Sequence, residues 1–285
     1  MAKKSLLGKF WLVLVMVPVL VFIYAPLLWL LSSSISTRAD LLAMPPRFFP
    51  QQPSFENYAN ILLPGKAVSE VARTFKVTLL NSLIVSLSTT VICLVISSLA
   101  AYALARLRLR YRDNFIIGIL SVRMIPEISL VIPLFIVAAR LSWLDKPVVL
   151  IVTYLSFSLP FAIWMLTTFF ETIPMELEDA ALMDGSSRLN TLFQIILPLA
   201  SPGIVSTALF IFLLAWDEFF FALIFTSTVA AKTVPVAIAE FTGRYAVDIT
   251  AMMAGGVLAA LPPVILALVF QRYIVSGLSA GAVKG

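Results

Sequence analysis

The sequence feature that most constrains the fold is a series of long apolar runs. Residues 10–31 form one such run, in which Pro18 and Pro26 would bend a helix without ending it. A helix needs roughly 20 mostly apolar residues to cross a bilayer core of about 30 Å. Hydrophobic residues make up 61% of the chain and charged residues 12%, whereas soluble domains are about half apolar and about a quarter charged. The runs therefore predict a membrane protein.

Six such segments are apolar enough to be spans. We predict an all-α, polytopic membrane protein with a single transmembrane domain over residues 1–285. An even number of spans places both termini on the same side of the membrane. The predicted spans cover about residues 10–31, 79–104, 115–139, 148–170, 199–225 and 252–273.

The first run also raises the alternative of a signal peptide, because Lys3, Lys4 and Lys9 precede it. The run is longer than the 7–15-residue apolar region of a signal peptide, and no A-x-A cleavage site follows it. A retained span is the better interpretation.

Clusters of basic residues predict the orientation. Loops that carry an excess of Lys and Arg stay in the cytoplasm. The count over the whole chain is nearly balanced, so the prediction rests on two clusters that we place inside, together with both termini. The clusters are Lys3, Lys4 and Lys9 before the first span, and Arg106, Arg108, Arg110 and Arg112 after the second. A nucleic-acid site is a poor alternative for the arginines, because their loop is short and lies next to the membrane.

Composition argues against several kinds of chemistry. The chain has no histidine and one cysteine, Cys93, which lies in an apolar run. The usual zinc, copper and iron–sulfur ligand sets cannot be assembled from these residues, and we expect no metal site. No G-x-x-x-x-G-K-[ST] loop is present to hold nucleotide phosphates. We therefore expect a protein without its own ATPase site and without a bound cofactor, and an intramembrane enzyme is a weak alternative.

The loop between the fourth and fifth spans, residues 171–198, does not have the pattern of a simple linker. It predicts two short helices around a turn. Pro174 suits the first turn of the first helix, and Asp184-Gly185 suits its end, because glycine accepts a left-handed backbone. The second helix should end at Pro198. Its expected apolar face is formed by Leu189, Leu192, Phe193 and Ile196.

This loop resembles the EAA loop of permeases of ABC importers. The matching residues are Asp179-Ala180-Ala181, Gly185, Ile195 and Leu197-Pro198, with Asp179 where the family usually has Glu. Further stretches resemble the maltose-type sugar permeases, and Asp217 stands where that family more often has Asn. These stretches are Asn81-Ser82-Leu83, Met124-Ile125-Pro126, Leu159-Pro160-Phe161, Trp216-Asp217-Glu218-Phe219, Thr233-Val234-Pro235-Val236 and the C-terminal residues 277–285.

The resemblance implies a division of labour between subunits. It implies uptake of a sugar or oligosaccharide across the inner membrane of a prokaryote by alternating access. The expected partners are a homologous sister permease, two copies of an ATPase that binds ATP and Mg, and an external solute-binding protein. The loop would dock into the ATPase, and the C-terminal tail either reaches the ATPase interface or is a frayed end. The implied docking residues are Glu178, Asp179, Ala180, Ala181, Asp184 and Gly185.

Ionisable residues within spans are candidates for the substrate pathway, because charges are costly in lipid. Either they contact substrate, or Arg123 satisfies Asp217 or Glu218 structurally. A related permease for a glycerol phosphate or a polyamine is the alternative function. The pathway candidates are Asn81, Arg123, Glu127, Trp216, Asp217 and Glu218, and Tyr154 and Trp164 are weaker ones.

Overall fold

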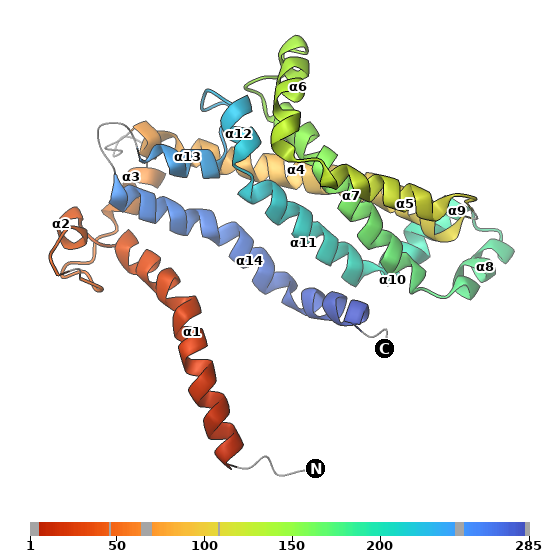
Figure 1. Ribbon diagram of the computed structural model, residues 1–285, viewed down its shortest axis with the longest axis horizontal. Coiled ribbons are helices and arrows are strands. Elements are labelled where there is room, and N and C mark those ends of the chain that lie inside the picture. The colour runs from red at the N-terminus through yellow and green to blue at the C-terminus, as the bar shows by residue number, and fades with distance from the viewer. Residues whose placement is uncertain (1–5, 46, 64–69, 108, 243–247, 283–285) are drawn as a thin grey trace. The chain divides into compact units, whose positions relative to one another are not determined.

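The computed structural model describes all residues except 1–5, 46, 64–69, 108, 243–247 and 283–285. In the described residues the regular secondary structure is helical and no strand is present, which confirms the predicted all-α class (Figure 1). The residues that the structure does not describe include Lys3, Lys4, Arg108 and the last three residues of the predicted tail.

Among the described residues, four helices are long and apolar enough to cross a membrane. They are α1 (Leu6–Ser34), α4 (Glu70–Arg106), α7 (Pro147–Glu171) and α14 (Ile249–Ala282). Two further pairs of helices pass the same test together, although each pair is sharply bent. The total rises to six if each bent pair is one span.

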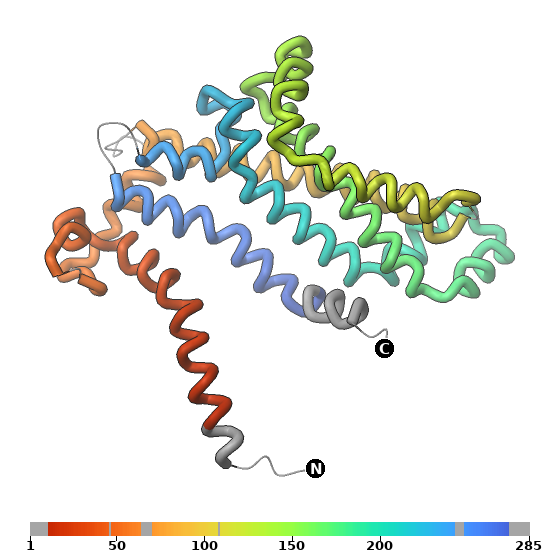
Figure 2. The backbone as a smooth tube through the Cα atoms, viewed as in Figure 1, coloured from red at the N-terminus to blue at the C-terminus, as the bar shows by residue number. Residues whose placement is uncertain are grey.

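The first bent pair replaces the continuous helix that we predicted for residues 115–139. The chain forms α5 (Arg112–Ser121), a 3₁₀ turn η1 (Val122–Met124) and α6 (Glu127–Arg140), with a bend of 89°. Ile125 has ψ 123°, the extended conformation that a following proline favours. Pro126 therefore breaks the helix here. The change of direction can be followed where the tube turns from yellow to green (Figure 2).

The second bent pair begins in the loop that we predicted to be two short helices. After α8 (Met175–Met183) come α9 (Arg188–Thr191), the π-helical turn η2 (Leu192–Ile196) and α10 (Leu197–Leu199). The chain then bends by 82° into α11 (Ser201–Asp217). Helical structure thus continues past Pro198, which we expected to end it.

The predicted span over residues 199–225 is also interrupted at its other end. The α11 helix stops at Asp217, and α12 (Phe220–Phe225) starts only after Glu218, which has an extended backbone with ψ 122°. The remaining helices are α2 (Arg38–Leu41), α3 (Glu56–Leu62) and α13 (Val234–Glu240).

The chain forms two compact units, and the divisions between them fall within α4, α13 and α14. The first unit comprises Met1–Lys76 and Ala237–Leu261. Its polar contacts include Ser34 with Tyr58 at 2.7 Å and the Asn57 side chain, which donates to the carbonyl of Ser34 at 2.9 Å. These hydrogen bonds therefore connect the end of α1 to α3.

The second unit, Val77–Val236 and Pro262–Gly285, carries the candidate sites. Lipid is as apolar as leucine, so close packing and small residues hold membrane helices together. The α11 helix accordingly meets α7 where Gly203 faces the ring of Phe169. One buried cluster joins α7, α11 and α12, and a second lies around the end of α7 and η2. Members of the first include Leu150, Tyr154, Phe221 and Phe225, and members of the second include Leu166, Phe170, Leu192 and Ile196.

Candidate coupling loop and substrate pocket

The α8 helix is bounded by the residues that the sequence indicated. Pro174 precedes it, and Gly185 follows it with φ 86°. The Gly185 N–H donates to the carbonyl of Leu182 at 3.1 Å, and the Ser186 N–H donates to that of Ala181 at 3.0 Å. These two bonds form a Schellman motif, which requires the left-handed residue at the glycine. The predicted glycine stop is confirmed.

Glu178 is almost completely buried on the inner face of α8. The Tyr102 hydroxyl donates to its Oε1 at 2.5 Å, and Arg106 Nε lies 3.3 Å from its Oε2. Arg188 Nη1 lies 3.6 Å from Oε1. The carboxylate is thus held between α4, α8 and α9.

The predicted docking residues lie on two different faces of this loop. Ala181 is buried like Glu178, whereas Asp179 and Ala180 are exposed, and so are Asp184 and Gly185 after the helix. The surface of this helix that is open to a partner therefore contains Asp179 and Ala180 but not Glu178. Docking through the exposed residues stays a prediction.

Two arginines that we interpreted only as orientation signals have structural contacts at this loop. Arg106 Nη2 donates to the carbonyls of Phe170 at 2.9 Å and Ile173 at 2.8 Å, at the end of α7. Arg112 forms an ion pair with Glu171. These partners are far apart in the sequence, so no local pattern in the arginine cluster could have indicated them.

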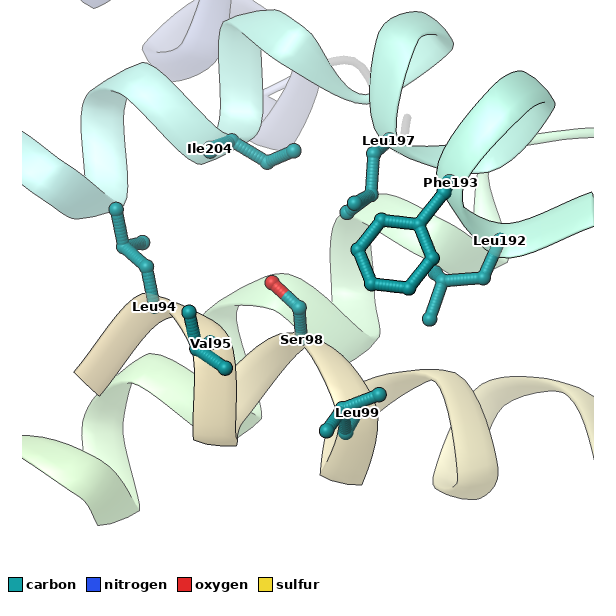
Figure 3. A pocket seen from close by; sticks show the side chains of 8 residues that line it. All are labelled: Leu94, Val95, Ser98, Leu99, Leu192, Phe193, Leu197 and Ile204. Atoms are coloured by element: carbon teal, nitrogen blue, oxygen red, sulfur yellow. The ribbon is translucent and has the colours of Figure 1, made fainter. Parts of the chain in front are cut away.

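The second half of the loop exposes part of its apolar face. Leu192 and Ile196 are buried as predicted, but Leu189 and Phe193 are 60% and 59% exposed. The π-helical turn shifts the register by one residue, which a pattern based on an α-helix cannot anticipate. A pocket of about 190 Å³ lies between this segment and α4, and the Ser98 hydroxyl points into it (Figure 3). Its lining is Leu94, Val95, Ser98, Leu99, Leu192, Phe193, Leu197 and Ile204.

A second pocket, of about 150 Å³, brings together three of the six main pathway candidates and one of the two weaker ones, Tyr154. Arg123, Glu127 and Glu218 line it, whereas Asn81, Trp216 and Asp217 do not. The lining of this cavity therefore combines polar, aromatic and aliphatic groups. The other lining residues are Tyr154, Phe157, Ser158, Leu214, Ala215 and Phe221.

Glu218 is satisfied by hydrogen bonds within the chain. The Tyr154 hydroxyl donates to Glu218 Oε2 at 2.6 Å, and the N–H groups of Phe221 and Ala222 donate to the same carboxylate at 2.8 and 3.1 Å. The Arg123 guanidinium lies over the ring of Phe161 at 5.6 Å. No ion pair joins Arg123 to Glu218 in the part of the chain that the structure describes, and the alternative that Arg123 satisfies Asp217 or Glu218 stays a prediction.

The other three candidates differ in their surroundings. Trp216 is buried and stacks on Phe212 with ring centroids 5.5 Å apart. The Asn81 amide donates to the carbonyls of Val229 at 2.9 Å and Lys232 at 3.1 Å, which fixes the segment after α12. Asp217, the last residue of α11, is exposed. Asn81 and Trp216 thus have structural contacts, and Asp217 is open to a partner or substrate.

No group of three or more Cys, Asp or Glu side chains that could hold a metal ion occurs in the part of the chain that the structure describes.

Comparison with known proteins defines the class. Residues 94–280 match the family of binding-protein-dependent transport system inner membrane components. The chain belongs to this family, and it is an inner-membrane component of an ABC transporter.

Two curated relatives are similar over most of their length. The sulfoquinovosyl glycerol transport system permease protein of Agrobacterium fabrum is 39% identical over 91% of this chain and 88% of its own. The trehalose/maltose transport system permease protein of Thermococcus litoralis is 40% identical over 91% of each chain. A chain of a bacterial ABC transporter involved in the import of alginate matches the fold with a TM-score of 0.79. That chain is 22% identical, and the match covers 96% of this chain and 99% of the other.

Proposed function

We propose that this chain is the permease subunit of an ABC importer that takes up a sugar or oligosaccharide by alternating access. The observation that carries the proposal is the similarity to permeases named for trehalose, maltose and sulfoquinovosyl glycerol, over 91% of the chain. A glycerol phosphate would call for several cations around the solute, yet the pocket lined by Glu127 and Glu218 contains one arginine.

The energy for transport comes from another subunit in this proposal. The sequence has no phosphate-binding loop of the P-loop type, so ATP and Mg would be bound by a dimer of ATPase subunits. A sister permease would complete the pathway, and an external binding protein would deliver the solute. Both termini of this chain would be cytoplasmic.

The exposed face of α8 is the surface that we propose for docking to the ATPase. Asp179 and Ala180 lie on this face, and Met183, at the end of the helix, is 88% exposed. The small alanine permits close approach, and the carboxylate suits a basic partner surface. Asp184 and Gly185 follow at the turn and set the direction of the next helix.

The pocket around Arg123 is the part of this chain that we propose for contact with the sugar. The guanidinium donates several hydrogen bonds, Glu127 accepts them, and the ring of Phe157 offers an apolar face. A sugar presents hydroxyl groups at its edges and C–H groups on its faces, which suits this mixture. Glu218 would position Tyr154 and α12 here.

Uptake by the assembled transporter tests the proposed solute class. The chain is co-expressed with its transport partners, and uptake of labelled trehalose, maltose and alginate oligosaccharide is compared with that of putrescine and glycerol 3-phosphate. We expect uptake from the carbohydrate group only. Uptake of putrescine or glycerol 3-phosphate alone would overturn the assignment to sugars.

The turn after α8 offers a test of docking. No atom lies within 4 Å of a Cβ placed on Gly185, so only its backbone conformation constrains the residue. Gly185→Val should lower ATPase co-purification and uptake while the protein still reaches the membrane, because a β-branched residue strains this conformation. Gly185→Asn is the matched control, since asparagine tolerates it. Normal ATPase association in Gly185→Val would contradict docking through this turn.

A further inference from the structure

Two opposite charges are buried where α4 ends and α8 begins. The side chains of Arg106 and Glu178 are each 2% exposed, although both residues lie at helix ends outside the apolar part of the chain. Removing two charges from water is costly unless geometry and further hydrogen bonds compensate for the loss. Removing one partner of a buried pair is strongly destabilising, so this pair holds α4 and α8 in one relative geometry.

The Glu178 carboxylate is held from more than one side. Arg106 Nε contacts Oε2 at 3.3 Å as a charge contact without an aligned hydrogen bond. Tyr102, one turn earlier on α4, donates a short hydrogen bond to Oε1. Arg188 at the start of α9 lies near the same oxygen but is half exposed. The position of α8 relative to α4 is thus set mainly by two α4 side chains.

The same guanidinium extends the contact to α7. Arg106 Nη2 donates to the carbonyls of Phe170 and Ile173, and Nη1 lies 2.8 Å from the sulfur of Met175, the first residue of α8. The last carbonyls of a helix carry partial negative charge and favour a cation. One side chain therefore joins the cytoplasmic ends of α4 and α7 to α8.

We propose that Arg106, Glu178 and Tyr102 form a rigid joint that makes α8 move as one body with the ends of α4 and α7. This inference rests on the proposed function, in which an ATPase displaces α8. Without the joint, α8 is connected to the spans by the turn at residues 172–174, the bend at Gly185 and the packing of Ala181. Motion of α8 would then flex these turns instead of tilting the helices. Glu178 is a positioning residue in this account and makes no contact with the ATPase or the solute.

A reporter on α11 tests the joint without knowledge of the solute. The complex with its ATPase is reconstituted in lipid with Leu214→Cys as the reporter in a Cys93→Ala background. The rate of modification by a polar methanethiosulfonate is measured with and without Mg-ATP and vanadate. Leu214 lines the pocket and is 38% exposed, so its reactivity reports opening and closing of the cavity.

Glu178→Gln should reduce the ATP-dependent change in reporter reactivity by about tenfold, because motion of α8 would no longer be passed to the spans. ATPase association and ATP hydrolysis should persist, because the exposed face of α8 is unaltered. A purely structural role would instead lower association and membrane level together. Asp113→Asn, which removes an exposed carboxylate in the first turn of α5 and outside the docking loop, is the control and should leave the reporter response unchanged.

Tyr102→Phe provides a second, milder variant that removes a single hydroxyl. It should weaken the reporter response in the same direction. If Glu178→Gln does not accumulate, Tyr102→Phe alone tests the joint. An unchanged response in both variants, or in Tyr102→Phe alone if only that variant accumulates, overturns the joint.

A further variant separates failure of the joint from failure of the proposed function. Ala180→Trp, on the exposed face of α8, should prevent co-purification of the ATPase. If the ATPase still binds Ala180→Trp, docking through α8 is overturned, and the role of the joint with it. If Ala180→Trp blocks binding but Glu178→Gln responds normally, the joint alone is overturned.

Discussion

Neighbouring carboxylates in this chain have different environments, and the difference assigns them different roles. Glu218 accepts three hydrogen bonds from Tyr154 and from the start of α12, whereas Asp217, one position earlier, is exposed. Glu178 and Asp179 repeat this arrangement on α8. In each pair one carboxylate is a structural group and the other is available to a partner.

The first prediction compares Glu218 with Asp217. Glu218→Ala leaves a hydroxyl and two N–H groups without their acceptor, and each such buried group costs about 1–3 kcal/mol. Glu218→Ala should therefore lower the melting temperature of the detergent-solubilised protein clearly, as measured by scanning fluorimetry. Asp217→Ala should change stability by less than about 0.5 kcal/mol, as for other surface substitutions. Equal melting temperatures for the two variants would contradict the structural role of Glu218.

Sequence reasoning identified the kind of residue at these positions but not the partner. The Asp184-Gly185 pair predicted the left-handed turn because the cause is local, in the backbone preference of glycine. Whether Glu178 or Asp179 faces inward depends on Tyr102 and Arg106, which approach only when α4 packs against the loop. The residues next to Glu178 and Asp179 in the sequence cannot indicate that long-range contact.

At the scale of helices, prolines have opposite outcomes in this chain. Pro18 and Pro26 lie inside α1, and Pro160 lies inside α7. Pro126, by contrast, separates η1 from α6 at a bend of 89°. Apolar runs predicted where spans occur because length and hydropathy suffice for that. The runs could not predict the breaks, because membrane helices tolerate proline wherever neighbouring groups satisfy the freed carbonyls.

Contact between α7 and α11 gives the second prediction. A Cβ on Gly203 would overlap the ring of Phe169, so Gly203→Ala should destabilise the protein by about 1–3 kcal/mol through overpacking. The matched control is Gly118→Ala in α5, where no atom lies within 4 Å. This control should be neutral or should stabilise by up to about 1 kcal/mol, since alanine favours helix more than glycine does. Thermal unfolding in detergent measures both, and similar shifts would refute the close contact.

The connection between α6 and α7 gives a prediction about pH. Burial raises the pKa of Asp145, but hydrogen bonds from the Thr228 hydroxyl and from the N–H groups of Thr228 and Ser227 hold the pKa below its usual value. The ionised group therefore stabilises the folded state above about pH 4, and this contribution is lost as pH falls through the lowered pKa.

Asp145→Asn isolates this contribution. The difference in melting temperature between the native protein and the variant should be constant from about pH 7 to pH 5 and should shrink below about pH 4. Asp113→Asn, at a side chain that is 84% exposed, is a control for general acid effects. A difference that grows with acidity would contradict the assigned direction.

At the scale of the whole molecule, the two bent pairs decide how many times the chain crosses the membrane. Four helices of the described part of the chain are long and apolar enough to cross, and each bent pair adds a crossing only if its two halves enter opposite leaflets. The arginine cluster that predicted the orientation is partly committed to contacts with α7 and α8. Those contacts place the C-terminal ends of α4 and α7 on one side, so the two helices run in the same direction, as they do if α5 and α6 together cross between them.

Two exposed methionines test whether α5 and α6 together cross the membrane. Met44, before α3, is 96% exposed, and Met183, at the end of α8, is 88% exposed. If α5 and α6 together cross the membrane, three spans separate these residues, and they lie on opposite sides. If that pair does not cross, only α4 and α7 separate them, and both lie on the same side.

We expect opposite sides, with Met44 outside. Cys93 is fully buried, so the native thiol is silent, and Cys93→Ala removes it altogether. A membrane-impermeant maleimide should label Met44→Cys in intact spheroplasts and Met183→Cys only after lysis. Reaction of both variants in intact spheroplasts, or of neither, would indicate that α5 and α6 turn back within the membrane. Reaction of Met183→Cys alone would reverse the orientation, and α8 could not then meet a cytoplasmic ATPase.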